Sequence, residues 1–446
     1  MITKKRLAAA AALAAAGALA LAGCSGSGGG ADKPASAAPT HLEGTVSLWH
    51  FFSDREADVI QSVVDDFEKK YPDVKVEVHS GQDDEKITKA IAAGKDVDVA
   101  ISYSTDIVGT FCSSGAFIDL KPYIDRDKVD LGNLSAMPKS YTEFDGTRCA
   151  MPMLADAFGL YYNKDILQKF GYTAPPKTLS ELETMALQMT TYNKDGSIKT
   201  LGYNPLMGWG ENAAAHLGPA AGAQWLDDKG QSAVGADAGW PELMTWQRDF
   251  VQKIGYDKLQ KFTAGLGQEF SADNPFQTGK VAMNLDGEWR TAFIKDQAPD
   301  LDYGTAPFPT ADDHTDLYGG GYITGNIAGI GKGSKNPELA WALLKYLTTD
   351  TDAVVKAANG LGNVPTTTAA LQSPNLSLPD QFQTFLDIMA SPHSDTTPPS
   401  PVGAGYQKTF NDFWTKFQSG DGSGLTEGLK TVDKQINDQI ALTTGP

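Results

Sequence analysis

The sequence of 446 residues has few cysteines, few histidines and an excess of negative charge. Its six histidines are scattered singly, and no His/Cys/Asp cluster has the spacing of metal ligands, so we expect neither a metal site nor a cofactor. The 37 Lys and Arg against 55 Asp and Glu give a net charge of −18. Such an acidic surface repels phosphate backbones and argues against nucleic-acid binding.

The sequence also lacks the short motifs of several enzyme classes. It has no Gly-x-Ser-x-Gly elbow, no Gly-Lys-Ser/Thr phosphate loop and no His-Glu-x-x-His zinc motif. These absences favour a protein that is not an enzyme. An exported glycosidase stays open, because it needs only two positioned carboxylates. A surface adhesion or scaffold protein is disfavoured, because no internal repeat is visible.

Beyond residue 22 no apolar run approaches the length of a membrane-spanning helix. Residues 1–6 are basic, residues 7–22 are apolar, and Cys24 ends the stretch Leu-Ala-Gly-Cys. This pattern is typical of a bacterial lipoprotein leader, and the alternative is an ordinary secretory signal with a chance cysteine. We predict a leader over 1–23, a lipid on Cys24 and a flexible linker over 24–41. The protein would then be exported and held at the outer face of the cytoplasmic membrane, with a net charge of about −21 after loss of three basic residues.

Two further cysteines, Cys112 and Cys149, follow the predicted leader. Two thiols in an exported protein favour one disulfide. The alternative is a pair of buried free thiols.

Hydrophobic patterning predicts alternating strands and helices after the linker. Residues 44–49 and 74–78 alternate as strands, and 97–102 read as a buried strand. Between them, apolar residues at helical spacing predict helices over 54–70 and about 85–93. Strand–helix alternation predicts an α/β fold with parallel pairing and helices on both faces of the sheet. About 400 residues exceed one core of usual size, so we expect two lobes.

In open α/β sheets, ligands bind beyond the carboxyl ends of the strands. The loops after Leu48, Ile101 and Leu285 are therefore candidates for one shared site. The third loop belongs to FQTGKVAMNLDGEW, 276–289, in which an apolar run ends at Asp-Gly and is followed by Trp289.

Four stretches, taken together and in order, resemble the extracellular solute-binding proteins of bacterial ABC importers, the group that includes the maltose- and oligosaccharide-binding (family 1) proteins. They are the opening SLWHFFSDREADVIQSVVDDFEKKYPDVKVEV, the segment ADAFGLYYNKDILQKFGYTAPPKTLSELETMA, the FQTGKVAMNLDGEW stretch and GGGYITGNIAGIGKGSKNPELAWALLKYLTTD. The resemblance extends from about residue 44 to residue 440.

The resemblance implies a type 2 periplasmic-binding-protein-like clamp, in which two lobes, each a mostly parallel sheet flanked by helices, close over a ligand. It places lobe 1 at 42–155 plus 307–360 and lobe 2 at 156–306 plus 361–446, with crossings near 153–158, 305–309 and 358–365. The implied ligand is a small-molecule sugar, by preference an oligosaccharide, which is bound without any bond being made or broken. The implied protein partners are the permease subunits of an ABC transporter, to which the sugar is delivered. We expect the protein to act as a monomer.

A sugar site needs aromatic planes for C–H faces and polar groups for hydroxyls, since an unpaired polar group in a closed cleft costs about 1–3 kcal/mol. The resemblance places Trp289 as the stacking aromatic and Asp156 as a hydroxyl-binding carboxylate. Further candidates lie in the loops around them: Trp209, Glu211, Glu288, Ser53, Asp54, Ser104, Thr105, Asp106, Gly320, Gly321, Tyr322 and Tyr406.

Alternatives remain for several of these residues and for the ligand. Trp289, Trp209 and Tyr406 could be core residues, and Trp225, Trp240, Trp341 and Trp414 fit core or helix packing better than ligand contact. The ligand could be a glycerophosphodiester, a polyamine or an iron chelate in place of a sugar. A phosphate would favour Arg at the cleft, and the candidate loops contain few, with Arg290 the nearest.

Overall fold

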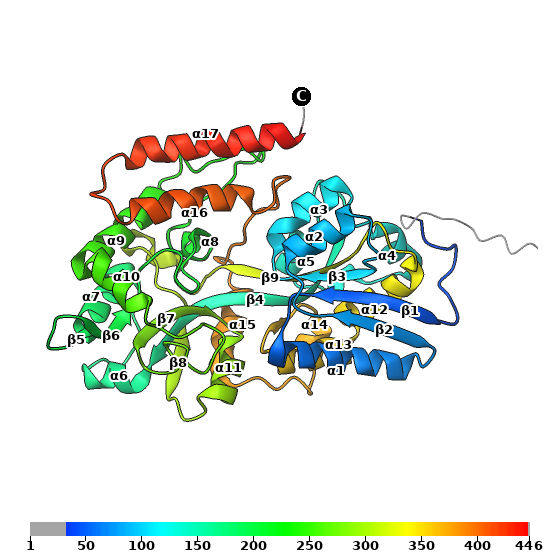
Figure 1. Cartoon of the computed structure of the whole chain (residues 1–446), viewed down its shortest axis with the longest axis horizontal. Coiled ribbons are helices and arrows are strands. Elements are labelled where there is room, and N and C mark those ends of the chain that lie inside the picture. The colour runs from blue at the N-terminus through cyan, green and yellow to red at the C-terminus, as the bar shows by residue number, and fades with distance from the viewer. Residues whose placement is uncertain (1–32, 445–446) are drawn as a thin grey trace, which may run out of the picture.

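A computed structural model describes residues 33–444 of the chain. The predicted leader, Cys24 and the start of the linker lie outside these residues. Residues 33–41 contain no helix or strand, and the Ala35 N–H donates to Glu338 (2.7 Å) on the first lobe. Two lobes lie side by side along the long axis, joined by strands that run between them (Figure 1).

The first lobe begins with the predicted alternation, which is confirmed. Its elements are β1 (Gly44–His50), α1 (Asp54–Lys70), β2 (Val74–His79), α2 (Asp84–Ala92) and β3 (Val99–Ser102). β1 pairs in parallel with both β2 and β3. Helix α1 forms because Ile60, Val63, Val64 and Phe67 share one buried face, with acidic residues in its first turn and lysines in its last.

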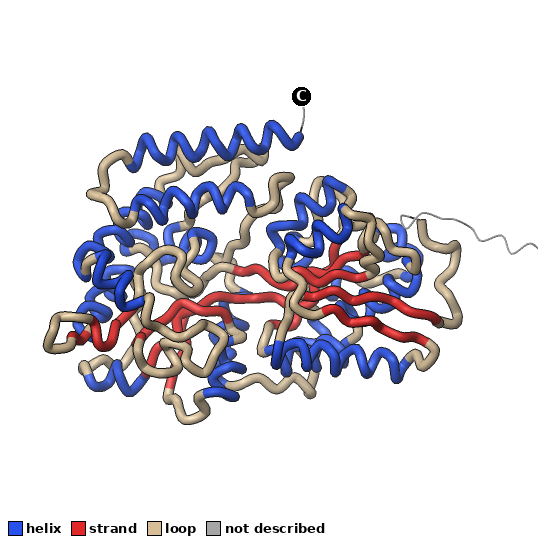
Figure 2. The backbone as a smooth tube through the Cα atoms, in the orientation of Figure 1, coloured by secondary structure: helices blue, strands red, loops and turns tan. Residues whose placement is uncertain are grey.

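Strand β4 (Ala150–Asn163) runs through both lobes. Its first half pairs antiparallel with β9 (Ile323–Ile330), which also pairs with β3, and with the short β10 (Val364–Pro365). Its second half pairs with β7 (Val281–Gly287) and β8 (Tyr303–Ala306). Asp156 and Phe158 therefore lie where β4 passes from one lobe to the other, as Figure 2 shows for the strands as a whole.

The predicted two-lobed, helix-flanked fold is confirmed, but the expectation of mostly parallel sheets is wrong. The strand order is β2-β1-β3-β9-β4-β7-β6-β5, and only β1–β2, β1–β3 and β6–β7 are parallel among the pairs described. The antiparallel pairs arise because β4 and β9 carry the chain in opposite directions between the lobes.

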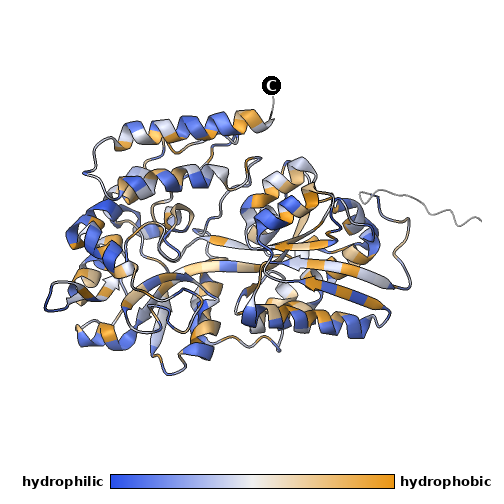
Figure 3. Ribbon diagram, viewed as in Figure 1, coloured by the Kyte–Doolittle hydropathy of each residue, from blue (hydrophilic) through white to orange (hydrophobic). Residues whose placement is uncertain are grey.

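The second lobe has its own core, in which Trp240, Phe250, Met283 and Trp414 are buried. β5 (Thr191–Tyr192) and β6 (Ile198–Tyr203) pair antiparallel around the turn at 193–197. The helices of this lobe carry hydrophilic residues outward, most clearly on α17 (Figure 3). They are α6 (Lys164–Lys169), α7 (Leu179–Met189), α8 (Ala214–Leu217), α9 (Gly239–Ile254), α10 (Tyr256–Thr263), α11 (Arg290–Gln297), α16 (Gly405–Phe417) and α17 (Leu425–Thr444).

The remaining elements lie mainly on the first lobe, whose core buries Phe67, Tyr123 and Trp341. Its helices are α3 (Val108–Ser114), α4 (Lys121–Asp127), α5 (Ala136–Tyr141), α12 (Pro337–Thr349), α13 (Thr351–Leu361) and α14 (Thr368–Leu371), while α15 (Gln383–Ala390) packs on β4 between the lobes. Short 3-10 turns occur at Thr105–Ile107, Leu131–Asn133, Gly218–Ala221, Asp312–Leu317 and Asp380–Phe382. No helix of the described residues is long and apolar enough to cross a membrane.

The predicted lobe boundaries remain a prediction, and the contacts around two crossings suggest an adjustment. Phe308 and Ala311 belong to the second-lobe core, and the Thr310 N–H donates to the Lys177 carbonyl (3.1 Å). Ala370 belongs to the first-lobe core. We therefore propose that the second crossing lies at β9, after residue 320, and the third after α14.

Cys112 and Cys149 form the predicted disulfide, with Cα atoms 5.3 Å apart. Cys112 belongs to α3, and Cys149 directly precedes β4. The bond therefore fastens α3 to the start of the strand that joins the lobes.

Candidate functional site

A cavity of about 440 Å³ lies around the middle of β4, with walls from both lobes. Of the predicted residues, Trp289, Asp156, Glu211, Ser104, Asp106 and Tyr322 line it. The loops after β1, β3 and β7 thus meet at one place, as expected from the carboxyl ends of the strands.

Trp289 and Phe158 form an aromatic wall of the cavity. Trp289 follows β7 and precedes α11, and its side chain is half-buried. Its ring folds back over Gly287, where a Cβ atom would lie only 2.1 Å from the ring, so no larger residue fits there without moving the tryptophan. Phe158 meets it edge-on with ring centroids 5.3 Å apart. The indole Nε1 has no hydrogen-bond partner in the described residues and is available to an acceptor.

Asp156 is held at the lobe crossing by an amide bridge. The Asn363 Nδ2 donates to Asp156 Oδ1 (2.6 Å) and to Glu288 Oε1 (2.9 Å), and the Ala157 N–H donates to Glu288 Oε2 (2.7 Å). Burial raises the pKa of Asp156 to about 7, although the bond from Asn363 opposes the shift. Burial and the nearby Asp156 also raise the pKa of Glu288, so the pair holds a proton near neutral pH.

The first lobe contributes a polar edge. Ser104 accepts a hydrogen bond from the Asp106 N–H (3.1 Å) and so begins the turn that follows β3. Burial raises the pKa of the Asp106 carboxyl, and it also raises the pKa of Glu56 in the first turn of α1. Both acids line the cavity.

The second lobe contributes Glu211 and His216. The ring of His216 stacks on Phe158 at 4.0 Å, and its Nδ1 lies 2.6 Å from the Glu211 carbonyl oxygen, to which a protonated Nδ1 donates. Burial lowers the pKa of His216 to about 4, so the ring is neutral at pH 7. Burial and the carboxylates of Glu269 and Asp286 raise the pKa of Glu211.

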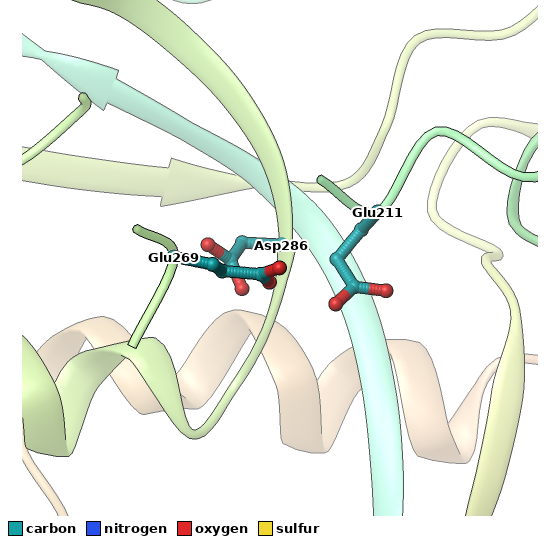
Figure 4. A group of neighbouring side chains, drawn as sticks. All are labelled: Glu211, Glu269 and Asp286. Atoms are coloured by element: carbon teal, nitrogen blue, oxygen red, sulfur yellow. The ribbon is translucent and has the colours of Figure 1, made fainter. Parts of the chain in front are cut away.

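Figure 4 shows the carboxylates of Glu211, Glu269 and Asp286 converging from different segments. Their oxygens lie within 4.8 Å of one another, as ligands of a metal ion could. Arg290 already supplies a cation there, since its Nε donates to Asp286 Oδ2 (2.7 Å) and its Nη2 lies 3.8 Å from Glu269. Arg290 is fully buried and does not line the cavity. Arg290 therefore forms ion pairs with two of the three carboxylates.

The other predicted contacts lie outside the cavity lining, and their role in binding stays a prediction. Trp209 lines a smaller cavity of about 160 Å³ beside Glu269, and Glu288 is fully buried behind Asp156. Ser53 and Asp54 are exposed at the start of α1, and Thr105 is buried against Thr324. The remaining three are also buried: Gly320, Gly321 and Tyr406.

Tyr406 has the contacts of a core residue. It is 1% exposed, its hydroxyl donates to the Pro398 carbonyl (2.9 Å), and its ring packs edge-on against Trp225. Gly320 and Gly321 lie beside His393 and Ile388, which leave no room for a side chain at Gly320.

The sequence reasoning missed much of the lining. Tyr103 and Phe270 are about half exposed at the cavity, 52% and 55%, and Tyr103 directly follows a predicted strand, which was a usable signal. Asn363 lies between α13 and β10, and only the tertiary structure brings it to Asp156. The other lining residues not predicted are Phe51, Phe52, Glu56, Phe158, Ala213, Ala215, His216, Thr324, Asn326 and Gln407.

Comparisons with known proteins agree with this architecture. The family model described as bacterial extracellular solute-binding protein matches residues 53–354. A maltotriose-binding protein of Pyrococcus abyssi is 26% identical over 337 residues, covering 75% of this chain and 69% of that protein. A maltodextrin-binding protein of Bacillus subtilis is 26% identical over 359 residues, covering 75% and 77%.

A solved structure of CpMnBP1 with mannotriose bound superposes with a TM-score of 0.79 at 24% identity, covering 88% of this chain and 99% of that chain. At this identity the likeness establishes the fold. Since the family model spans more than half of the sequence, the chain belongs to the bacterial extracellular solute-binding proteins.

Proposed function

We propose that this protein captures an oligosaccharide in the cavity between its lobes and delivers it to an ABC permease. The observation that carries the proposal is the composition of the cavity. Aromatic planes from Trp289, Phe158 and Tyr103 face the same space as polar groups from both lobes, including Asp156 and Asn326.

Each part of this lining matches one kind of sugar surface. The C–H faces of a pyranose are apolar and gain from covering an aromatic plane. Its hydroxyls need partners, and carboxylate and amide oxygens accept from them while amide N–H groups donate. Walls from two lobes favour a closed form, since only closure makes both sets of contacts.

The relatives support an oligosaccharide over other solutes. Two curated relatives are named for maltotriose and maltodextrin, and the solved structure that superposes contains mannotriose. These ligands belong to those proteins and show no specific sugar for this one. The family comprises solute-binding proteins, so we propose that the carboxylates of the cavity position hydroxyls and do not hydrolyse a glycosidic bond.

Export and anchoring complete the proposal. A lipid on Cys24 and the linker after it would tether the lobes at the outer face of the membrane, within reach of the permease. We also propose that the protein acts as a monomer and that its partner is the permease of an ABC transporter.

Titration calorimetry with a panel of neutral tri- and tetrasaccharides, including maltotriose and mannotriose, tests the function. We expect saturable one-to-one binding to at least one member of the panel. Chromatography after prolonged incubation with the protein should show that this sugar is unchanged. Release of shorter sugars would contradict binding without turnover and favour the glycosidase alternative. Binding of a glycerophosphodiester in place of every sugar would contradict the oligosaccharide assignment.

A further inference from the structure

The ionisable groups that line the cavity are overwhelmingly acidic. Glu56, Asp106, Asp156 and Glu211 contribute four carboxyl groups, whereas no Lys or Arg of the described chain is among the lining residues. His216 adds no positive charge, because burial keeps its imidazole neutral at pH 7. A ligand that enters this space therefore meets a lining whose ionisable side chains are mainly acidic.

The two nearest arginines are already engaged. Arg290 is fully buried and paired with Asp286 behind the wall. Arg55 donates to the Gly360 carbonyl (2.6 Å) and lies 3.6 Å from Asp296 on the opposite lobe. Both guanidinium groups act to lower the pKa of Glu56, but burial has the larger effect and raises it. Arg55 Nη2 also lies 4.0 Å from Glu56 Oε1, so Glu56 has a cation beside it, whereas Asp106, Asp156 and Glu211 have no ion pair with a Lys or Arg of the described residues.

An independent observation is an unpaired buried acceptor at the same place. Asn326 is 4% exposed and lines the cavity, and its Oδ1 has no hydrogen-bond partner among the described residues. Its Nδ2 lies 3.5 Å from Asp156 Oδ2, so the empty acceptor and the carboxylate are neighbours. Asp106 Oδ1 is also unpaired. A buried acceptor without a donor destabilises the site, and a ligand N–H or O–H would satisfy it.

The negative charge of a buried carboxylate can be compensated by a bound proton or by a neighbouring cation. A neutral sugar donates hydroxyl hydrogens but leaves these carboxyls compensated only by the protons that burial holds on them. An ammonium supplies three donors and a positive charge, and it is also attracted to the faces of Trp289 and Phe158.

We propose that the preferred ligand is an oligosaccharide bearing a protonated amine, whose ammonium donates to Asp156 and to Asn326 Oδ1. This inference rests on the proposed function and narrows its substrate class. A linear polyamine offers the same ammonium but no pyranose ring for the aromatic wall.

Matched sugars test the charge alone. The β-1,4-linked trimer of glucosamine, its fully N-acetylated form and cellotriose share one backbone and carry an ammonium, an amide or a hydroxyl at C2. The monosaccharides glucosamine, N-acetylglucosamine and glucose repeat the comparison independently of linkage, and spermidine tests an ammonium without a ring. Calorimetry is carried out at a pH at which the amine is protonated. The ammonium member of each set should bind at least about tenfold more tightly than its neutral counterparts, which corresponds to a binding free energy more favourable by about 1.4 kcal/mol.

The outcomes separate this inference from the proposed function. Equal or tighter binding of neutral sugars overturns the amine requirement and leaves the oligosaccharide function standing. Binding of spermidine without any sugar overturns both, and so does the absence of binding to every probe of both panels.

Isosteric variants locate the charge. Asp156→Asn should reduce the ratio of ammonium to neutral affinity about tenfold, and Asp106→Asn, from the other wall, provides a second variant in case the first does not fold. Glu427→Gln, an exposed acid on α17 that is paired with Lys430, is the matched control and should leave the ratio unchanged. An unchanged ratio in both folded cavity variants would overturn the assignment.

Discussion

At the scale of single residues, Trp289 has two roles that can be separated. Its half-buried ring faces the cavity while one side packs over Gly287 and against Phe158. The ring therefore packs as a core residue does on one side, while its contact with a ligand stays a prediction.

We expect Trp289→Ala to weaken ligand binding by about 2–4 kcal/mol, the range of a truncated hot-spot aromatic. The loss of unfolding free energy without ligand should be smaller than for Trp341→Ala, which removes a fully buried side chain and should cost about 3–5 kcal/mol. Calorimetric titration and thermal melts of both variants check this. A large loss of apo stability with normal binding by the folded fraction would identify Trp289 as a core residue.

We predict that a lipid on Cys24 holds the protein at the membrane. If the predicted lipid is attached there, Cys24→Ala should move the protein from the membrane fraction to the soluble fraction, because the acyl chains supply the membrane affinity. Fractionation of cells followed by immunoblotting measures the shift, with the wild-type chain as control. Unchanged membrane association of the variant would show that another feature anchors the chain.

At the scale of elements, the disulfide connects α3 to the start of β4 across a sequence separation of 37 residues. In the loop-entropy model, such a bridge stabilises the fold by about 3–4 kcal/mol. The double variant Cys112→Ser/Cys149→Ser should unfold at a correspondingly lower denaturant concentration while keeping the slope of the transition similar. Mass spectrometry of unreduced peptides provides the direct check, and finding both thiols free in the mature protein would contradict the bridge.

Strand β4 explains why the site lies where it does. Its first half belongs to the first-lobe core through Met151 and Leu154, and its second half to the second-lobe core through Leu160. The residues between these halves, including Asp156 and Phe158, are therefore fixed by both lobes at the cavity wall. A short loop at this place could not hold a carboxylate so firmly.

At the scale of the whole molecule, the lobes already contact each other beside the cavity. Arg55 of α1 pairs with Asp296 of α11 and lies over Phe293, at 4.9 Å from the ring centroid. We expect a ligand that contacts both lobes to shift the balance between lobe arrangements.

Small-angle scattering should therefore show a smaller radius of gyration at saturating ligand than without ligand. The Trp289→Ala variant serves as the control, because the same sugar concentration does not saturate its weakened site. Its radius of gyration should change less than that of the wild type. A constant radius for the wild type at proven saturation would reject closure while leaving binding intact.

The sequence by itself determined the alternating elements of the first lobe, the family and the general position of the site. Local periodicity carries this information: the apolar face of α1 and the buried runs of β1, β3 and β7 are visible without knowing their neighbours. Ser104 could be predicted because it follows such a run, whereas the roles of Trp289 and Asp156 were predicted from the family resemblance.

Only the tertiary structure decided which polar groups share the cavity. Asn363 reaches Asp156 across 207 positions of the sequence and also donates to Glu288, which is fully buried. The antiparallel path of β4 and β9 likewise depends on how the chain returns between lobes. Such contacts depend on long-range pairing and burial, and no local pattern of residues encodes which distant side chain will complete a hydrogen bond.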